Sequence, residues 1–501
     1  MLTTADLSRL DPRWTGRLPY NFAKRNGVIA ACGRDNGIEL WTRPETPSSI
    51  LIEVQRALGQ VVWPQPLSAE DFDSALSRAY ERGRSDALEI ADGDLDLGDL
   101  AHQLPRVEDL LESEDDAPIV RLLNALFSQA VRDGASDIHI EPFETRTVVR
   151  FRIDGVLRDV LEPPQAAHGV IVSRVKIMAH LDIAEKRMPQ DGRIALRLAG
   201  RPVDVRVSCL PTAHGERVVM RLLDKHAGQL TLPALGMSPD ILSSLDELIH
   251  CPHGIILVTG PTGSGKTTTL YAALSQLDTR SHNIMTVEDP IEYDLDGIGQ
   301  TQTNPRIDLS FARALRAILR QDPDIIMIGE IRDLETAQIA VQASLTGHLV
   351  LATLHTNDSV GAVTRLVDMG VEPFLVASSL IGVLAQRLVR RLCPRCRREH
   401  VPDAAERRLL QIDPADAAAH LLYATSGCET CNQTGYQGRT GIFELLRVDE
   451  PLRSMVHDGA AEAQLREHAR ARGMTSVRED GLRWVRAGNT SIEEVLRVTR
   501  D

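Results

Sequence analysis

Residues 260–267 have the sequence GPTGSGKT and lie between an apolar run, GIILVT, and a helical pattern, TTTLYAALSQL. Glycines in such a loop let backbone N–H groups converge on phosphate oxygens, and the helix start adds positive potential. The alternative is a glycine-rich turn without a ligand, which the strand, loop and helix context argues against. We predict a site for ATP and Mg²⁺, with Lys266 on the outer phosphates and the Thr267 hydroxyl on the metal, formed by Gly260, Pro261, Thr262, Gly263, Ser264, Gly265, Lys266, Thr267 and Thr268.

Carboxylates follow two other apolar runs, where a nucleotide hydrolase needs them. NIMTVED ends at Glu288 and Asp289, and DIIMIGE ends at Glu330. Carboxylates directly after apolar strands lie at the carboxyl edge of an α/β sheet, where ligands bind. We therefore expect Glu330 to be catalytic. Asp333 begins the helical pattern DLETAQIAVQASL, and capping of that helix is its favoured role.

His355 and an arginine stripe are weaker signals. His355 ends a third apolar run, HLVLATLH, but a lone histidine is usually structural. Arg313, Arg316 and Arg320 share one helical face because they are three and four residues apart. Taken by itself, such a stripe is by default solvated charge.

Four of the seven cysteines form two CxxC pairs, Cys393 with Cys396 and Cys428 with Cys431. Two such pairs match a closed tetrahedral Cys₄ zinc site, so we predict structural Zn²⁺ that takes no part in catalysis. A thioredoxin-like redox motif is disfavoured because this region lacks a βαβ pattern. We expect the remaining cysteines to be small core residues: Cys32, Cys209 and Cys251.

The elements that position these groups follow from hydrophobic periodicity. Apolar runs separated by amphipathic helices are typical of a doubly wound parallel α/β domain, whereas the segment before it alternates between helical and strand periods. A hairpin is expected around Asn36-Gly37. The expected parts are a small N-terminal domain at 1–69, an acidic linker at 70–116, a mixed α+β domain at 117–228, the α/β domain at 235–390, a cysteine module at 391–435 and a C-terminal helical region at 436–501.

Composition excludes several classes of protein. The 501 residues are 43% hydrophobic and 25% charged, which is globular, and the formal charge of −14 argues against nucleic acid or anionic lipid as the main partner. Residues 70–116 contain 16 acidic and 4 basic residues, which fits a linker or, alternatively, a docking peptide. No signal peptide or membrane span is visible, so we expect a cytoplasmic chain.

Beyond spacing, the motifs resemble those of a known group. GPTGSGKTTTLY, TVEDPIEY, LRAILRQDPDIIMIGEIRD, TGHLVLATLHTND and the paired cysteines look like the secretion ATPases of the type II/type IV pilus superfamily, in order over about residues 117–501. RLPYNFAKRNGV, the short N-terminal domain and the length resemble the type II secretion ATPase, the general secretory pathway protein E family.

The resemblance implies a hexamer of RecA-like ATPase domains, each preceded by a mixed α+β, PAS-like domain. It implies a peripheral position on the cytoplasmic face of the bacterial inner membrane, docking of the N-terminal domain on inner-membrane secretion proteins, and ATP hydrolysis that drives pseudopilus assembly and export of folded proteins. The roles it implies are Lys266 and Thr267 in the phosphate loop, Glu288 and Asp289 as an Asp box, Glu330 as the Walker B acid, and His355 as a His box.

The resemblance also turns four arginines from surface charge into phosphate-facing groups, with closure of the mixed domain on the ATPase domain gating hydrolysis. Guanidinium groups suit this role because they stay charged and bind phosphate oxygens in a fork. The four are Arg206, Arg221, Arg316 and Arg320.

Three rival functions remain at this stage. A type IV pilus assembly ATPase is the nearest, although such proteins usually have a longer N-terminal region. A nucleic-acid motor is kept open by the basic stretch at 391–408, but the acidic balance and the 4% aromatic content argue against it. A non-hydrolysing ATP-binding scaffold is disfavoured by Glu330.

Overall fold

The computed structural model describes residues 117–198, 201–224, 230–413, 420–500 and most of 10–79, where positions 16, 19, 35–36, 45, 69–70, 73–74 and 77–78 are left out. The chain divides into two compact units. The first comprises residues 1–151 and 157–224, and the second comprises 152–156 and 225–501. Within the described ranges, no helix is both long and apolar enough to cross a lipid bilayer.

The N-terminal part of the first unit is a three-stranded sheet in the order β1-β2-β3, with a helix connecting its parallel pair. Its elements are α1 (Pro12–Thr15), α2 (Tyr20–Asn26), β1 (Val28–Arg34), β2 (Gly37–Thr42), α3 (Ser48–Leu58) and β3 (Val62–Pro66). The antiparallel pairing of β1 with β2 confirms the expected hairpin, although Asn36 itself is outside the described residues.

The boundary expected at residue 69 is wrong. Trp41 and Leu67 pack in one core cluster with Phe72, Leu76 and Ala79, so the small domain continues to about residue 79. The apolar residues of this segment have an amphipathic helical spacing, but its acidic composition led us to expect a linker. Most of the expected acidic linker, from residue 80 to 116, lies outside the described residues.

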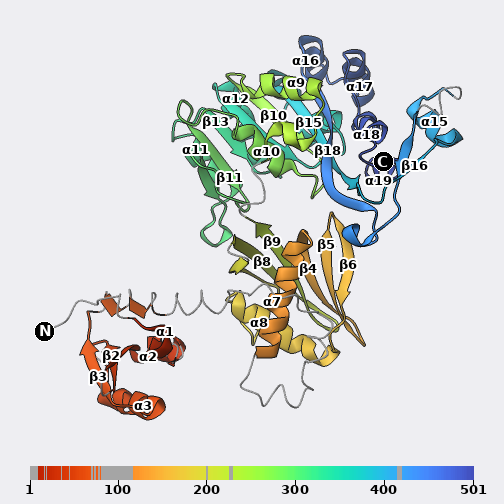
Figure 1. Cartoon of the computed structure of the whole chain (residues 1–501). Coiled ribbons are helices and arrows are strands. Elements are labelled where there is room, and N and C mark those ends of the chain that lie inside the picture. The colour runs from red at the N-terminus through yellow and green to blue at the C-terminus, as the bar shows by residue number, and fades with distance from the viewer. Residues whose placement is uncertain are drawn as a thin grey trace. The chain divides into compact units, whose positions relative to one another are not determined.

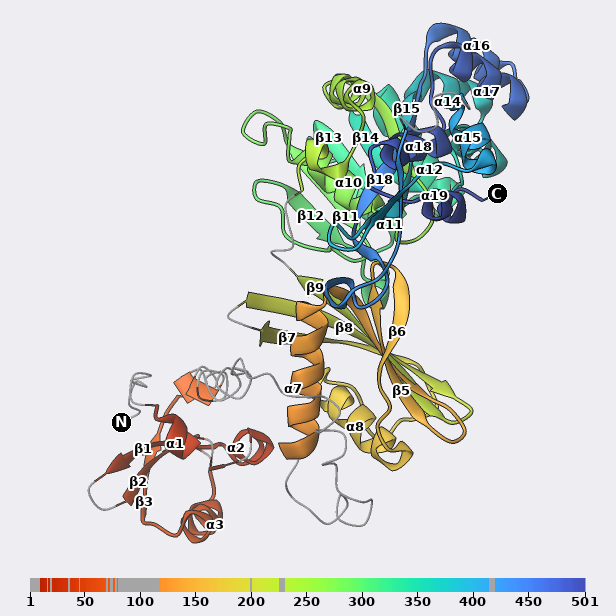
Figure 2. The ribbon, with the colours of Figure 1, turned by 45° about the vertical axis from the view of Figure 1, so that its right-hand side comes forward.

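The rest of the first unit is a six-stranded sheet in the order β6-β5-β4-β9-β8-β7. Its two long helices lie side by side against the sheet (Figures 1 and 2). This is the expected mixed α+β domain. Its elements are α7 (Ala117–Arg132), β4 (Ala135–Pro142), β5 (Thr147–Ile153), β6 (Val156–Leu161), α8 (His168–Met178), β7 (Gln190–Leu198), β8 (Arg201–Thr212) and β9 (Gly215–Asp224).

The second unit is built on a seven-stranded sheet in the order β12-β11-β13-β14-β10-β15-β18, with helices on both faces (Figure 1). Alternate residues of its interior strand β10 face different cores: Ile255 and Leu257 pack in one cluster, Ile256 and Val258 in the other. The four predicted apolar runs form β10 (Gly254–Thr259), β11 (Ile284–Glu288), β13 (Ile325–Ile328) and β14 (Leu349–Leu354).

Helices α9 and α10 cover one face, and α11 to α14 with α16 and α17 cover the other. This is the doubly wound arrangement that the sequence predicts. The other elements of the domain are α9 (Pro239–Ile249), α10 (Lys266–Leu274), β12 (Gly299–Gln302), α11 (Phe311–Ile318), α12 (Leu334–Leu345), α13 (Ser359–Asp368), α14 (Pro373–Ser379) and β15 (Leu380–Leu392).

The chain after residue 391 does not form only a cysteine module and helices, which corrects the expected division. Residues 436–447 form β18, which pairs antiparallel with β15 as the edge strand of the seven-stranded sheet. These residues form a strand because they pair with β15, which is distant in the sequence, so local periodicity does not predict the strand. The remaining elements are β16 (Arg398–His400), α15 (Ala404–Leu410), β17 (Leu422–Ala424), β18 (Tyr436–Arg447), α16 (Glu450–His457), α17 (Glu462–Ala471), α18 (Val477–Arg486) and α19 (Ile492–Val498).

Candidate active site

The loop at 260–265 joins β10 to α10 and has the backbone of a phosphate cradle. Gly260, Gly263 and Gly265 have φ values of 145°, 79° and 87°, and Gly265 is the N-cap of α10. A Cβ atom on Gly260 would meet the Gln386 carbonyl oxygen at 2.4 Å. Glycine is required here because both the backbone angle and the space exclude a side chain.

Lys266 lies inside this loop, where its ammonium group donates to the carbonyls of Gly260 at 2.8 Å and Pro261 at 3.0 Å. Burial lowers the pKa of Lys266 to about 8, Glu330 raises it and Arg387 lowers it. A buried ammonium whose hydrogen bonds go to neutral carbonyl groups gains much from an anionic partner. Lys266 is therefore placed to bind phosphate charge.

The neighbouring polar side chains fit the nucleotide that the sequence predicts. The Ser264 hydroxyl is buried and has no hydrogen-bond partner within the described residues. Thr267 is in the first turn of α10, where a hydroxyl can bind the metal that accompanies the phosphates, and Thr268 follows it. This donor set suits a triphosphate with Mg²⁺.

Glu330 follows β13 and is the centre of a charged group at the carboxyl edge of the sheet. It forms an ion pair with Arg332, and its Oε2 lies 3.6 Å from Nε2 of His355, which follows β14. Arg332 also approaches Asp289, after β11, at 3.9 Å. Three neighbouring strands thus bring together Glu330, His355 and Asp289, as their positions after apolar runs led us to expect.

Glu288 is placed differently from Glu330. Its carboxylate is buried and accepts hydrogen bonds from Thr286 at 2.5 Å, from Gln300 at 3.1 Å and from the Tyr271 hydroxyl. Burial, and then the bond to Glu288, raise the pKa of Tyr271. This closed network fixes α10 to β11, and the catalytic role of Glu288 stays a prediction. Asp333 accepts from the Thr336 N–H at 2.8 Å, so the predicted cap of α12 is confirmed.

The arginines of α11 lie on its surface. Arg316 forms a 2.6 Å ion pair with Glu335, and Arg313 forms a 2.7 Å pair with Asp308. Arg320 is the second residue after the end of α11. A phosphate-facing role for Arg316 and Arg320 stays a prediction.

The arginines of the six-stranded sheet form a row. Arg206 on β8 is directly opposite Arg221 on β9 and Arg193 on β7, so the three share one face. Arg221 is bound to Asp137 at 2.9 Å, and Arg193 forms an ion pair with Asp204. These carboxylates offset the repulsion between like charges that lie directly opposite each other. The role of Arg206 and Arg221 at the nucleotide stays a prediction.

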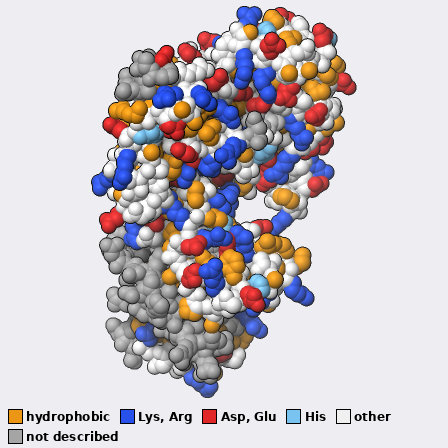
Figure 3. Space-filling model, turned by 90° about the vertical axis from the view of Figure 1, so that its right-hand side faces the viewer, with side chains coloured by type: hydrophobic (Ala, Val, Ile, Leu, Met, Phe, Trp, Pro, Cys, Tyr) orange, Lys and Arg blue, Asp and Glu red, His pale blue; other side chains and the backbone are white. Residues whose placement is uncertain are grey.

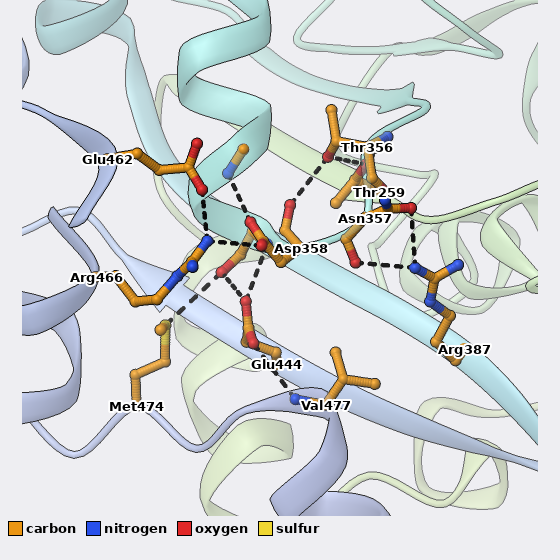
Figure 4. A network of polar contacts seen from close by, with 12 residues as sticks. Thr259, Thr356, Asn357, Asp358, Arg387, Glu444, Glu462, Arg466, Met474 and Val477 are labelled. Atoms are coloured by element: carbon orange, nitrogen blue, oxygen red, sulfur yellow. Dashed lines mark hydrogen bonds and ion pairs between the residues drawn. The ribbon is translucent and has the colours of Figure 1, made fainter. Parts of the chain in front are cut away.

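Several groups that hold the site were not foreseen. The Thr356 N–H, next to His355, donates to the Thr259 hydroxyl at 2.9 Å (Figure 4). Gln386 is buried on β15 and bonds both the loop and α10. The signal that could have revealed Gln386 is a polar residue inside the apolar run LIGVLAQRLV.

The helix that follows His355 is anchored at its first residues. Asp358 caps α13 through the Gly361 N–H at 2.7 Å and also accepts from Arg466 of α17 at 2.7 Å. Glu444 on β18 is buried and accepts from the Ser359 N–H at 2.9 Å and the Val477 N–H at 3.3 Å (Figure 4). One carboxylate therefore meets the positive ends of both α13 and α18.

The four paired cysteines converge as predicted. Their Sγ atoms all lie within 4.8 Å of one another, with 3.9 Å between Cys393 and Cys428 and 3.8 Å between Cys396 and Cys431. Zinc bonds of about 2.3 Å in a tetrahedron separate sulfur atoms by about 3.8 Å. The donor set is thus compatible with Zn²⁺, and it would join the end of β15 to the start of β18. Of the other cysteines, Cys209 is buried, whereas Cys32 and Cys251 are only partly buried.

Removing one sulfur tests the zinc prediction. We expect the parent to contain close to one zinc per chain by elemental analysis, and Cys393→Ser to lose it. Thermal unfolding should then shift down by several degrees, because metal binding contributes to folding, while nucleotide affinity stays within about 2-fold. Cys251→Ser, outside the cluster, should retain zinc. Parental protein purified without chelators yet free of zinc would contradict the prediction.

The fold and the phosphate loop, with Lys266 and Glu330, define a phosphate-loop ATPase of the RecA-like class. The chain belongs to the type II/IV secretion system protein family, whose model matches residues 112–497, and residues 17–80 match the model of an N-terminal domain of GSPII protein E. The protein is accordingly a secretion ATPase.

Relatives extend over nearly the full chain. It is 60% identical to the type II secretion system protein HxcR of Pseudomonas aeruginosa, covering 97% of this chain and 99% of the relative. It is 56% identical to the type II secretion system ATPase E of Vibrio cholerae, with 97% of each covered.

Solved structures agree with this fold. The pilus retraction motor PilT with bound ADP is 26% identical and has a TM-score of 0.51 over 75% of this chain and 96% of that one. The Legionella pneumophila ATPase DotB shares the fold at 20% identity, with a TM-score of 0.56 over 75% of this chain and 95% of that one.

Proposed function

We propose that the protein is a hexameric motor that works at the cytoplasmic face of the bacterial inner membrane. There, ATP hydrolysis powers type II protein secretion through pseudopilus assembly and export of folded proteins. The observation that carries the proposal is the joining, in one chain, of the N-terminal domain matched to GSPII protein E and an ATPase domain whose Lys266, Glu330 and His355 lie at one sheet edge.

In the proposed reaction, Lys266 and the loop N–H groups bind the phosphates, and Thr267 helps to hold Mg²⁺. Mg²⁺ would supply charge neutralisation at the β- and γ-phosphates. Glu330 orients the attacking water. His355, whose Nε2 lies 3.6 Å from Oε2 of Glu330, is proposed to respond to the γ-phosphate. The four arginines are proposed to stabilise the charge that develops in the transition state.

The rival functions are less well supported. A type IV pilus assembly ATPase is disfavoured because the relatives described above carry type II secretion names. For a nucleic-acid motor we would expect a continuous basic track, whereas Lys and Arg side chains are mixed with Asp and Glu on the face drawn in Figure 3. Stimulation of ATPase activity by single-stranded DNA, and not by acidic phospholipid, would favour that rival.

The proposed membrane role is tested through the N-terminal domain. Deleting residues 1–100 should leave nucleotide binding intact and abolish recruitment to inner membranes that contain the secretion proteins, measured by flotation. Trp63→Ala should weaken recruitment in the full chain, because this tryptophan is 47% exposed on edge strand β3. Val401→Ala, an exposed apolar site in the other unit, is the matched control. Unchanged membrane association of the deletion would refute docking by this domain.

A further inference from the structure

Strand β15 runs beside the phosphate loop. It pairs in parallel with β10, and the pairing ends at Thr259 opposite Ala385. The next two residues, Gln386 and Arg387, therefore lie level with the start of the loop. Their side chains point to opposite faces of the sheet because successive strand residues alternate.

Gln386 faces the helix that follows the loop. Its side chain accepts from the Thr269 hydroxyl at 2.7 Å and donates to the Ser264 carbonyl at 2.7 Å, and it is buried. It thereby fixes the loop and the first turn of α10 to β15. Its position explains why a Cβ atom at Gly265 would meet Gln386 at 2.9 Å.

Arg387 faces the segment that carries His355. Its guanidinium group donates to the backbone carbonyl of Asn357 at 3.2 Å and to the Asn357 side-chain oxygen at 3.1 Å (Figure 4). Both bonds come from Nη2, so this one nitrogen is held between the backbone and side-chain oxygens of Asn357. Because Asn357 is two residues after His355, Arg387 restrains where that segment leaves the sheet edge.

Two adjacent residues of one strand thus hold the two catalytic segments, Gln386 the phosphate loop and Arg387 the segment after His355. The charge of Arg387 also reaches the loop, since it lowers the pKa of Lys266. The hydrogen bond from the Thr356 N–H to the Thr259 hydroxyl joins the residue before Asn357 to the end of β10.

We propose that Arg387 is a positioning residue for ATP hydrolysis, which acts through Asn357 to hold the His355 segment in register with the phosphate loop. The proposal rests on the proposed roles of Lys266 and His355. It concerns the hydrolytic step and leaves ground-state nucleotide binding largely unaffected.

Steady-state ATPase kinetics of the full-length chain test it. Arg387→Ala should lower kcat about 10-fold or more with KM within about 3-fold, the pattern for loss of an interaction used in the transition state. Arg387→Lys should restore only part of kcat, because the lysine side chain is shorter and its ammonium group cannot occupy the same position as Nη2 of Arg387. Arg447→Ala, which removes an exposed arginine of β18 paired with Glu247, should retain parental kcat.

A double-mutant cycle separates positioning from a general structural role. Asn357→Ala should lower kcat in the same way, and the double variant with Arg387→Ala should be little worse than the worse single variant. Additive losses, or a parental kcat in Arg387→Ala, would overturn the proposal. If Arg387→Ala does not fold, the same cycle is measured with Arg387→Gln.

Parental hydrolysis by Lys266→Ala would refute the underlying ATP site, whereas a parental kcat in Arg387→Ala would overturn only the positioning role of Arg387.

Discussion

Glu330→Gln is expected to bind ATP with parental affinity and to hydrolyse it about 100-fold more slowly, or worse. The amide retains the size of the carboxylate and loses the charge that orients and activates water. The position supports a large effect, because Glu330 pairs with Arg332 and lies next to His355 at the carboxyl edge of the sheet. Phosphate release under saturating ATP, together with equilibrium binding of a fluorescent ATP analogue, measures both parts.

Glu450→Gln is the matched control for this substitution. Glu450 is an exposed glutamate at the start of α16 that pairs with Arg453. We expect it to retain turnover within about 3-fold, as for a typical surface ion pair. Equal rates for Glu330→Gln and the parent would remove Glu330 from the mechanism.

Lys266→Ala is expected to weaken nucleotide binding by at least about 10-fold. Loss of a hydrogen bond to a charged group costs about 1.5 to 3 kcal/mol, and about 1.4 kcal/mol is a factor of ten in affinity. Calorimetric titration with a non-hydrolysable ATP analogue measures the loss. Lys186→Ala, an exposed lysine of the first unit, should bind like the parent.

The parental protein should also bind nucleotide less tightly as the pH rises above about 8. Burial, the largest cause, holds the pKa of Lys266 near that value in the nucleotide-free protein, so the ammonium form is complete only at lower pH. Above that pH, phosphate must bind a neutral lysine or take up a proton with it, and either lowers the apparent affinity. Affinity that stays constant from about pH 7 to about pH 10 would show that Lys266 remains charged throughout.

The convergence of the proposed catalytic residues could be predicted because each comes after an apolar parallel strand, and the chain itself carries that signal. Glu330, His355 and Lys266 converge for this reason alone. The ion-pair partners could not be predicted: the contact between Arg221 and Asp137 joins residues 84 positions apart in sequence, and only the register of β4 with β9 brings them together.

The two β15 residues that hold the site could not be predicted for a related reason. Gln386 and Arg387 belong to an apolar run whose place in the sheet depends on pairing with Thr259 and its neighbours, and no local pattern encodes that pairing. The N-terminal domain extends beyond its expected boundary because charge dominates the composition around Phe72 and obscures the buried positions.

The late position of edge strand β18 in the sequence has a consequence for folding during synthesis. It is the seventh strand of a sheet whose other six are complete by residue 392, yet it begins only at Tyr436. During synthesis, the thirteen-residue β15 therefore emerges from the ribosome about 44 residues before its partner, and its unpaired edge is open to other chains. Messages truncated between these two strands should yield aggregating protein, and the cysteine pairs lie within the interval that separates them.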